Sequence, residues 1–230
     1  MPRYDYVLFD ADNTLYDFDR AEDRALALTL EHYGFPDTPE IRARYSAGNR
    51  ALWAAFDRRE VTKDFLLVER FAAFQRQMGT DHDSAEMNLY YLTRLSEGAF
   101  LLPGAEELCR ALAPHCTLAI ITNGVTLAQT GRFSRSPLRD VIPHLFISEQ
   151  LGTQKPDPAF FDAVLSALAV PDRSRAVVVG DSLTADIQGA VNSGLDSVWY
   201  NPKGLPIPDT PRPTLTACSY QQVLEYILGD

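Results

Sequence analysis

Four aspartates in this 230-residue sequence follow two short apolar runs, 6–9 and 176–179: Asp10, Asp12, Asp181 and Asp186. A cluster of carboxylates repels itself unless a cation lies within it. Oxygen ligands without clustered Cys or His favour Mg²⁺ over Zn²⁺, and the four histidines show no ligand spacing. We therefore expect a Mg²⁺ site, provided that the fold brings the aspartates together.

A turn and a lysine supply groups that suit an anion. Thr122, Asn123 and Gly124 follow a third apolar run, 118–121, and Lys155 precedes a proline. A Mg²⁺ ion held by few carboxylates is usually completed by a substrate phosphate, to which Lys155 and the Thr122 hydroxyl offer charge and hydrogen bonds. An aspartate beside the metal can attack phosphorus, and a second aspartate two residues later can transfer the proton. These residues predict phosphoryl transfer through an aspartyl-phosphate.

The elements that must position these residues predict an α/β fold. After about residue 103, short apolar runs alternate with helix-like segments, which indicates a parallel, Rossmann-like sheet covered on both faces. Ligands bind such sheets beyond the carboxyl ends of the strands, where all of the residues above lie. The predicted strands are 6–9, 118–121, 145–148, 176–179 and 196–200, and the predicted helices are 105–112, 127–133, 158–168, 185–193 and 220–228.

The segment after the first predicted strand has a different pattern. Its apolar residues recur at helical spacing, which predicts four or five helices and no strand. We interpret residues 16–99 as a helical cap inserted into a core domain formed by 1–15 and 100–230. The cap is expected to close over the strand ends and to select the substrate.

Composition excludes several classes of protein. The net charge is −10, whereas a nucleic-acid polymer or a membrane surface requires a basic face. No apolar run approaches the roughly 20 residues that span a bilayer, the first residues show no secretory signal, and the three cysteines are widely spaced. We expect a cytoplasmic monomer or small homo-oligomer whose partner is a small phosphomonoester.

The candidate residues resemble the motifs of the haloacid dehalogenase (HAD) superfamily of phosphatases. The four motifs appear in order and span the core: Asp10-Ala-Asp-Asn-Thr14, Thr122-Asn-Gly124, Lys155-Pro156 and Gly180-Asp-Ser-Leu-Thr-Ala-Asp186. The resemblance implies a Rossmann-like core with an inserted cap. Haloacid dehalogenases themselves lack the second aspartate of the first motif, so the presence of Asp12 favours phosphoryl transfer.

The resemblance also implies a role for each motif residue. Asp10 is expected to be the nucleophile and Asp12 the general acid and base, with Lys155 as a further catalytic residue. The implied metal ligands are Asp10, the main-chain carbonyl of Asp12, Asp181 and Asp186. The residues expected to hold the phosphoryl group are Thr122, Asn123 and Lys155.

Further segments resemble one subfamily, the noncanonical pyrimidine nucleotidases of the YjjG type. They are Phe9-Asp-Ala-Asp-Asn-Thr-Leu15, Asn49-Arg-Ala-Leu-Trp53, Ile121-Thr-Asn-Gly124, Ile147-Ser-Glu-Gln-Leu-Gly152 and Pro171-Asp-Arg-Ser-Arg175. This resemblance implies a 5′-nucleotidase that acts on pyrimidine nucleoside monophosphates. Asn49 and Trp53 lie four residues apart on one helix face, where they either contact base or sugar or, in the case of Trp53, pack the core of the cap.

Other functions remain open at this point. A HAD sugar-phosphate phosphatase or phosphomutase shares the same core motifs. A phosphoreceiver domain also uses Asp, Mg²⁺, Thr and Lys, but it leaves the helical insertion unexplained. A catalytically dead HAD-like binding protein has no reason to retain both Asp10 and Asp12.

Overall fold

A computed structural model describes residues 2–229 of the chain. The chain divides into two compact units. The first unit contains the chain up to Phe18 and from Ala99 onward, and the second contains Asp19–Gly98. Each unit is described separately below.

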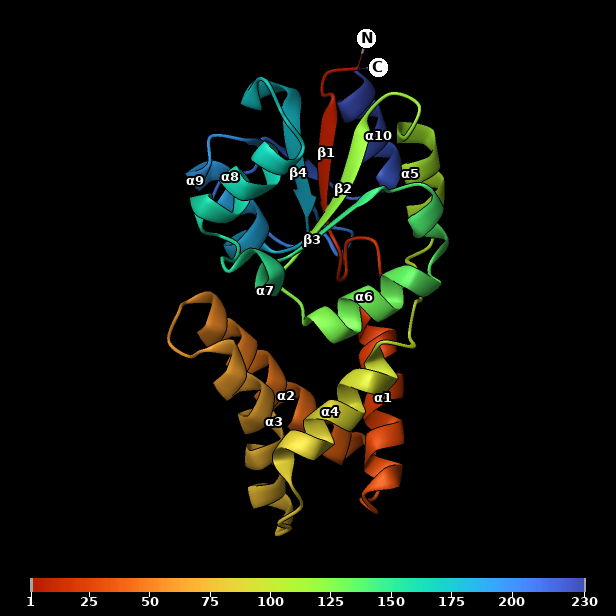
Figure 1. Cartoon of the computed structure of the whole chain (residues 1–230), viewed down its shortest axis with the longest axis vertical. Helices are drawn as coiled ribbons and strands as arrows, with labels where there is room; N and C mark the ends of the chain where they lie inside the picture. The colour runs from red at the N-terminus through yellow and green to blue at the C-terminus, as the bar shows by residue number, and fades with distance from the viewer. Residues whose placement is uncertain (1, 230) are drawn as a thin grey trace. The chain divides into compact units, whose positions relative to one another are not determined.

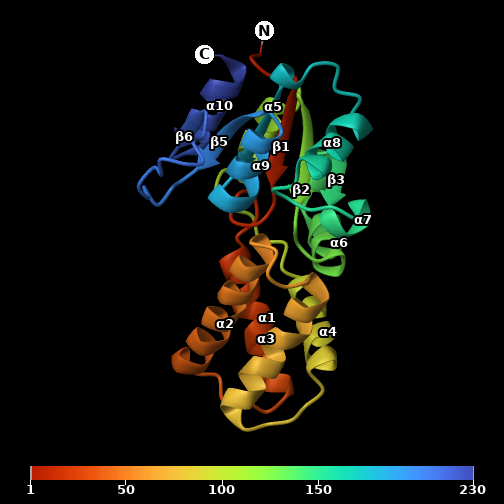
Figure 2. The ribbon, with the colours of Figure 1, turned by 90° about the vertical axis from the view of Figure 1, so that its left-hand side faces the viewer.

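The first unit is built on a six-stranded parallel sheet (Figure 1). The strand order is β3-β2-β1-β4-β5-β6, so β1 and β4 lie side by side near the centre (Figure 1). Figure 2 shows β2 and β3 on one side of β1 and β5 and β6 on the other. The bounds are β1 Tyr6–Asp10, β2 Thr117–Thr122, β3 His144–Ile147, β4 Ala176–Gly180, β5 Asp196–Tyr200 and β6 Leu215–Ala217. The strand β6 was not predicted, because three residues after a proline-rich loop form no apolar run.

Helices cover both faces of this sheet, as expected for parallel strands that are apolar on both sides. Buried residues of α5 and α10 pack with Val7, Phe9 and Ile120 on one face, and residues of α8 and α9 pack with Leu8 and Ile121 on the other. The helix bounds are α5 Ala105–Leu112, α6 Thr126–Arg135, α7 Ser148–Leu151, α8 Pro158–Ala167, α9 Gln188–Asn192 and α10 Tyr220–Leu228.

The second unit consists of four helices within its described residues: α1 Phe18–His32, whose first residue is the last of the preceding segment of the first unit, α2 Pro39–Asp57, α3 Lys63–Met78 and α4 Ser84–Leu95. Thr38, Thr62 and Asp83 each accept a backbone N–H in the first turn of the helix that follows, which explains where three of these helices begin. Tyr45 and Tyr91 pack against Phe71 in the buried interior. None of the helices in the described part of the chain is long and apolar enough to cross a bilayer.

Candidate active site

A tight turn follows β1, whose last residue is Asp10. The N–H groups of Leu15 and Tyr16 both donate to the Ala11 carbonyl, at 3.0 and 2.8 Å. Asn13 has a left-handed backbone with a φ of 59°, which asparagine adopts more readily than most residues. The turn folds the chain back at the carboxyl edge of the sheet, where Asp10 and Asp12 both lie.

Lys155 connects groups that follow or end three different strands. Its Nζ donates to Asp10 Oδ1 and to Asp186 Oδ1, both at 2.6 Å, and to the Ile121 carbonyl at 3.0 Å. An ammonium group has three N–H donors, so all three are used within the protein. In this arrangement Lys155 is a buried charge that fixes two carboxylates. Its direct contact with a phosphoryl group stays a prediction.

Asn123 positions Lys155 through two backbone contacts. Its Nδ2 donates to the Lys155 carbonyl and its Oδ1 accepts the Lys155 N–H, both at 2.9 Å. The neighbouring Thr122 is buried, and its Oγ1 accepts the Gly124 N–H at 3.0 Å. The structure therefore gives Asn123 a positioning contact, and the predicted contact of Thr122 and Asn123 with substrate stays a prediction.

Asp186 reaches the end of β4 because the last residue of that strand is glycine. Its Oδ2 accepts the Ser182 N–H at 3.1 Å. A Cβ atom on Gly180 would lie 2.2 Å from this Oδ2, so any larger residue would displace the carboxylate. Asp181, which follows Gly180, accepts the Thr14 hydroxyl at 3.4 Å. The fold thus brings the predicted residues of the first, third and fourth motifs together.

The carboxylates of Asp10, Asp181 and Asp186 form a cluster that suits a divalent cation. Each offers one oxygen, and these oxygens lie within 4.8 Å of one another. Three carboxylates facing the Lys155 ammonium leave two negative charges, which one divalent cation balances. The donor set consists of oxygen alone and therefore fits a hard cation such as Mg²⁺.

The pKa values of the cluster reflect burial and mutual repulsion. Burial raises the pKa of Asp10 well above its ordinary value; Lys155 opposes this shift and Asp186 adds to it. Burial and the charge of Asp186 raise the pKa of Asp181 to about 7. Burial by itself would lower the pKa of Lys155, but the charges of Asp10 and Asp186 raise it. A cation bound here would displace protons from the carboxylates.

Asp12 contacts α6 rather than this cluster. Gln129 Nε2 donates to Asp12 Oδ2 at 2.8 Å, and Arg132 Nη2 lies 2.6 Å from Asp12 Oδ1. Sequence reasoning missed Gln129 and Arg132. The signal that could have identified them is a pair of polar residues three apart on the inward face of a predicted helix. The carboxylate of Asp12 is not part of the cluster of Asp10, Asp181 and Asp186, and the metal contact expected of its main-chain carbonyl stays a prediction.

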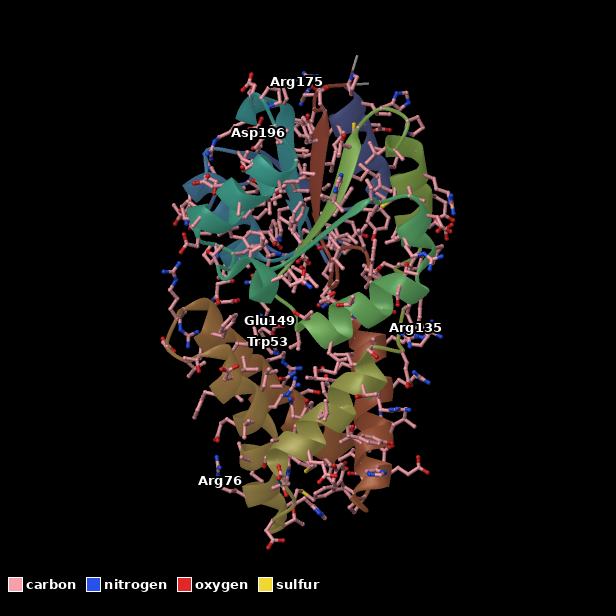
Figure 3. All side chains as sticks on the ribbon, in the orientation of Figure 1. Trp53, Arg76, Arg135, Glu149, Arg175 and Asp196 are labelled. Carbon is pink, nitrogen blue, oxygen red and sulfur yellow. The ribbon has the colours of Figure 1, made fainter. Side chains whose placement is uncertain are left out.

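The helical unit places the predicted residues Asn49 and Trp53 on α2. Asn49 is 3% exposed, its Nδ2 donates to Glu22 Oε1 at 2.7 Å, and its Oδ1 has no hydrogen-bond partner among the described residues. Trp53, labelled in Figure 3, is partly exposed and meets Phe56 edge to face, with ring centroids 5.6 Å apart. Trp53 therefore packs against its own helix and keeps an accessible surface, and its contact with substrate stays a prediction.

Comparison with known proteins establishes the family. A family model for haloacid dehalogenase-like hydrolases matches residues 4–194. The chain belongs to this haloacid dehalogenase-like hydrolase family. The predicted superfamily and the prediction that the protein is an enzyme are thereby confirmed.

Individual relatives in the family are similar over nearly their full length. The pyrimidine 5′-nucleotidase PynA of Streptococcus pneumoniae is 38% identical over 96% of this chain and 94% of its own. The pyrimidine 5′-nucleotidase YjjG of Escherichia coli is 33% identical over 98% of each chain. The crystal structure of the HAD-hydrolase YfnB of Bacillus subtilis, bound to magnesium, superposes with a TM-score of 0.93 at 35% identity, covering 99% of this chain and 100% of that one. This match and the parallel sheet confirm the predicted α/β HAD fold.

Proposed function

We propose that the protein is a Mg²⁺-dependent phosphomonoester hydrolase that acts through an aspartyl-phosphate, with pyrimidine nucleoside monophosphates as its substrates. One observation carries the chemistry: Lys155 holds Asp10 at the end of β1, while Asp12, two residues away, is oriented by a separate helix. Two neighbouring carboxylates in different surroundings suit a nucleophile and a proton carrier.

In the first half-reaction an oxygen of Asp10 attacks phosphorus and the ester P–O bond breaks. Lys155 occupies Asp10 Oδ1, which leaves Oδ2 for the attack. Protonated Asp12 gives its proton to the departing oxygen. The hydroxyl of Thr122, at the end of β2, donates a hydrogen bond to a phosphoryl oxygen.

In the second half-reaction a water oxygen attacks the phosphorus of the aspartyl-phosphate. Asp12, now a carboxylate, takes the proton of this water, and the bond between Asp10 and phosphorus breaks. Asp10 is thereby restored and inorganic phosphate leaves. Mg²⁺, held by Asp10, Asp181, Asp186 and the Asp12 carbonyl, supplies positive charge that offsets the charge of the phosphoryl group.

Replacing Asp12 by Asn is expected to produce a loss that depends on the leaving group. The first step with p-nitrophenyl phosphate needs no proton, because p-nitrophenolate is a stable anion, whereas an alkyl phosphate needs the acid. General acid catalysis contributes about 10²–10⁴-fold, so we expect a loss of that order in the first step with alkyl phosphates and a small loss with p-nitrophenyl phosphate. The measurement is the rate of phosphoenzyme formation by rapid mixing. Equal losses would show that Asp12 is not the acid.

The substrate class is supported by the relatives rather than by the core chemistry. The motifs act only on the phosphoryl group, and both PynA and YjjG are named pyrimidine 5′-nucleotidases. A pyrimidine nucleoside is flat and partly apolar, which suits an aromatic side chain such as Trp53 better than a sugar phosphate does. The helical unit is therefore proposed to select the leaving group.

A phosphate-release panel is expected to favour pyrimidine nucleoside monophosphates, with dTMP and dUMP among the better substrates. We expect their kcat/KM to exceed those of hexose phosphates by about 10-fold or more, as recognition of one additional group typically achieves. Trp53→Ala should raise KM for the nucleotides by about 10-fold through lost stacking.

The matched control is Phe65→Ala, which removes an exposed aromatic residue from α3 of the same unit and is expected to leave KM unchanged. A panel in which hexose phosphates exceed every nucleotide would move the assignment to sugar phosphates. If nucleotides are preferred but Trp53→Ala has no effect on KM, Trp53 only packs the helical unit.

A further inference from the structure

We propose that Gln129 and Arg132 form a clamp that holds the carboxylate of Asp12 in the orientation needed for proton transfer. Both would then be positioning residues for the reaction. The proposal rests on the function proposed above for Asp12. Its basis is the arrangement of three side chains within the first unit.

The clamp provides a separate contact for each oxygen of Asp12, a hydrogen bond at Oδ2 and an ion pair at Oδ1. Gln129 Nε2 donates to Oδ2 at 2.8 Å, and Arg132 Nη2 lies 2.6 Å from Oδ1. The two residues are three positions apart on α6, which places them on one face of that helix. A carboxylate held at one oxygen can rotate about its side-chain torsions, whereas one held at both oxygens cannot.

The Arg132 side of the clamp is buried, whereas the carboxylate of Asp12 is partly accessible to solvent. The side chain of Arg132 is 1% exposed, whereas that of Asp12 is 26% exposed. The ion pair lacks hydrogen-bond geometry, because neither Asp12 Oδ1 nor any guanidinium nitrogen of Arg132 has a hydrogen-bond partner among the described residues. The ring centroids of Tyr16 and Phe18 lie 5.4 and 5.7 Å from Arg132 Cζ. A buried guanidinium is costly without a compensating charge, and the carboxylate form of Asp12, which acts as the base in the second half-reaction, supplies that charge.

Gly124 leaves the space that the clamp requires. A Cβ atom at this position would lie 2.1 Å from Gln129 Nε2. The backbone of Gly124 is not left-handed, so the space, rather than backbone freedom, explains the glycine. The turn that carries Thr122 and Asn123 is thereby linked to the orientation of Asp12.

Orientation affects only the steps in which Asp12 moves a proton. Asp12 gives a proton to the ester oxygen as the P–O bond breaks, and it later takes one from the water that attacks phosphorus. A misplacement of 1 Å at a reacting group costs about 10²-fold in rate. Loosening the clamp should therefore slow proton transfer without weakening substrate binding.

The test compares phosphoenzyme formation with two substrates in four proteins: wild type, Gln129→Met, Arg132→Lys and Arg132→Met. Met keeps the length of the side chain without its amide, and Lys keeps the charge without the planar group. The substrates are p-nitrophenyl phosphate and the best alkyl phosphate from the panel. We expect Gln129→Met to slow the alkyl reaction by about 10- to 100-fold, the p-nitrophenyl reaction by less than about 3-fold, and KM to stay unchanged. Arg132→Lys should retain more of the alkyl reaction than Arg132→Met.

Two further variants isolate the effect. In the Asp12→Asn background, Gln129→Met should cost less than about 2-fold, because residues that act through one group are not additive. The control is Arg135→Met, a change at an exposed position near the end of the same helix (Figure 3), which should leave both rates unchanged. Thermal unfolding identifies any variant that fails to fold. If Arg132→Met fails to fold, the rates of Gln129→Met decide the test.

Equal slowing of both substrates by Gln129→Met, or an undiminished cost in the Asp12→Asn background, would overturn the clamp. A different result would overturn the role of Asp12 itself: Asp12→Asn would then slow both substrates equally. The two failures are distinguishable. If only the clamp fails, the rate loss in Asp12→Asn still depends on the leaving group, whereas the rate loss in Gln129→Met does not. If the role of Asp12 fails, the rate loss in Asp12→Asn does not depend on the leaving group.

Discussion

Replacing Asp10 by Asn is expected to abolish turnover while the protein stays folded. Asn presents no charged oxygen to phosphorus, and loss of a nucleophile typically costs about 10⁴-fold or more in kcat. The measurement is phosphate release by the purified variant at saturating substrate. Turnover at the wild-type rate would refute the assignment of Asp10 as nucleophile.

The fold should tolerate this change because of how Lys155 is held. The side-chain oxygen of Asn can still accept a hydrogen bond from Lys155 Nζ. Lys155 Nζ also retains its hydrogen bonds to Asp186 and to the Ile121 carbonyl. Asp186 and Asp181 repel the charge of Asp10, so relief of this repulsion offsets part of the attraction to Lys155 that is lost. We expect a free energy of unfolding within about 1 kcal/mol of wild type, equivalent to about 2–4 °C in Tm.

The matched control for Asp10→Asn is Asp162→Asn. Asp162 lies on α8 and forms an exposed ion pair with Arg173, of the kind that contributes little to stability. This variant should keep both full turnover and the wild-type Tm. A comparable loss of activity in the control would show that the assay reports something other than the nucleophile.

Removal of divalent metal is expected to abolish most of the activity. Asp10, Asp181 and Asp186 leave two uncompensated negative charges where the phosphate must bind. A metal typically supplies several kcal/mol of charge stabilisation, so EDTA should lower kcat/KM by about 10²-fold or more, and added Mg²⁺ should restore it. Undiminished turnover in chelated buffer would contradict the proposed metal site.

Mg²⁺ should also raise the Tm, and this increase should depend on pH. A ligand that binds only the folded state stabilises it, and metal binding requires ionised carboxylates. Because the pKa of Asp181 is raised to about 7, protons compete with the metal below that pH. The Mg²⁺-induced increase in Tm is therefore expected to be larger at pH 8 than at pH 6. It should be lost in Asp181→Asn and retained in Asp162→Asn.

The sequence by itself determined which side chains reach the carboxyl edge of the sheet. Apolar runs predicted five of the six strands, and the rule that parallel strands end at one edge placed Asp10, Thr122 and Asp181 there. Helical spacing likewise predicted the insertion after the first strand. These signals are local, since each depends on residues within a few positions of one another.

Only the tertiary structure decided which of these side chains touch. Lys155 contacts Asp10 across 145 positions and Asp186 across 31, and Gln129 contacts Asp12 across 117. Nothing in the sequence indicated that the three donors of Lys155 are used within the protein, or that Asn49 is engaged by Glu22. Such contacts depend on strand order, on the packing of helices against the sheet and on the space left by Gly124 and Gly180. Local periodicity places a residue at an edge or on a face, whereas the distance between two side chains is set by packing between elements that are remote in the chain.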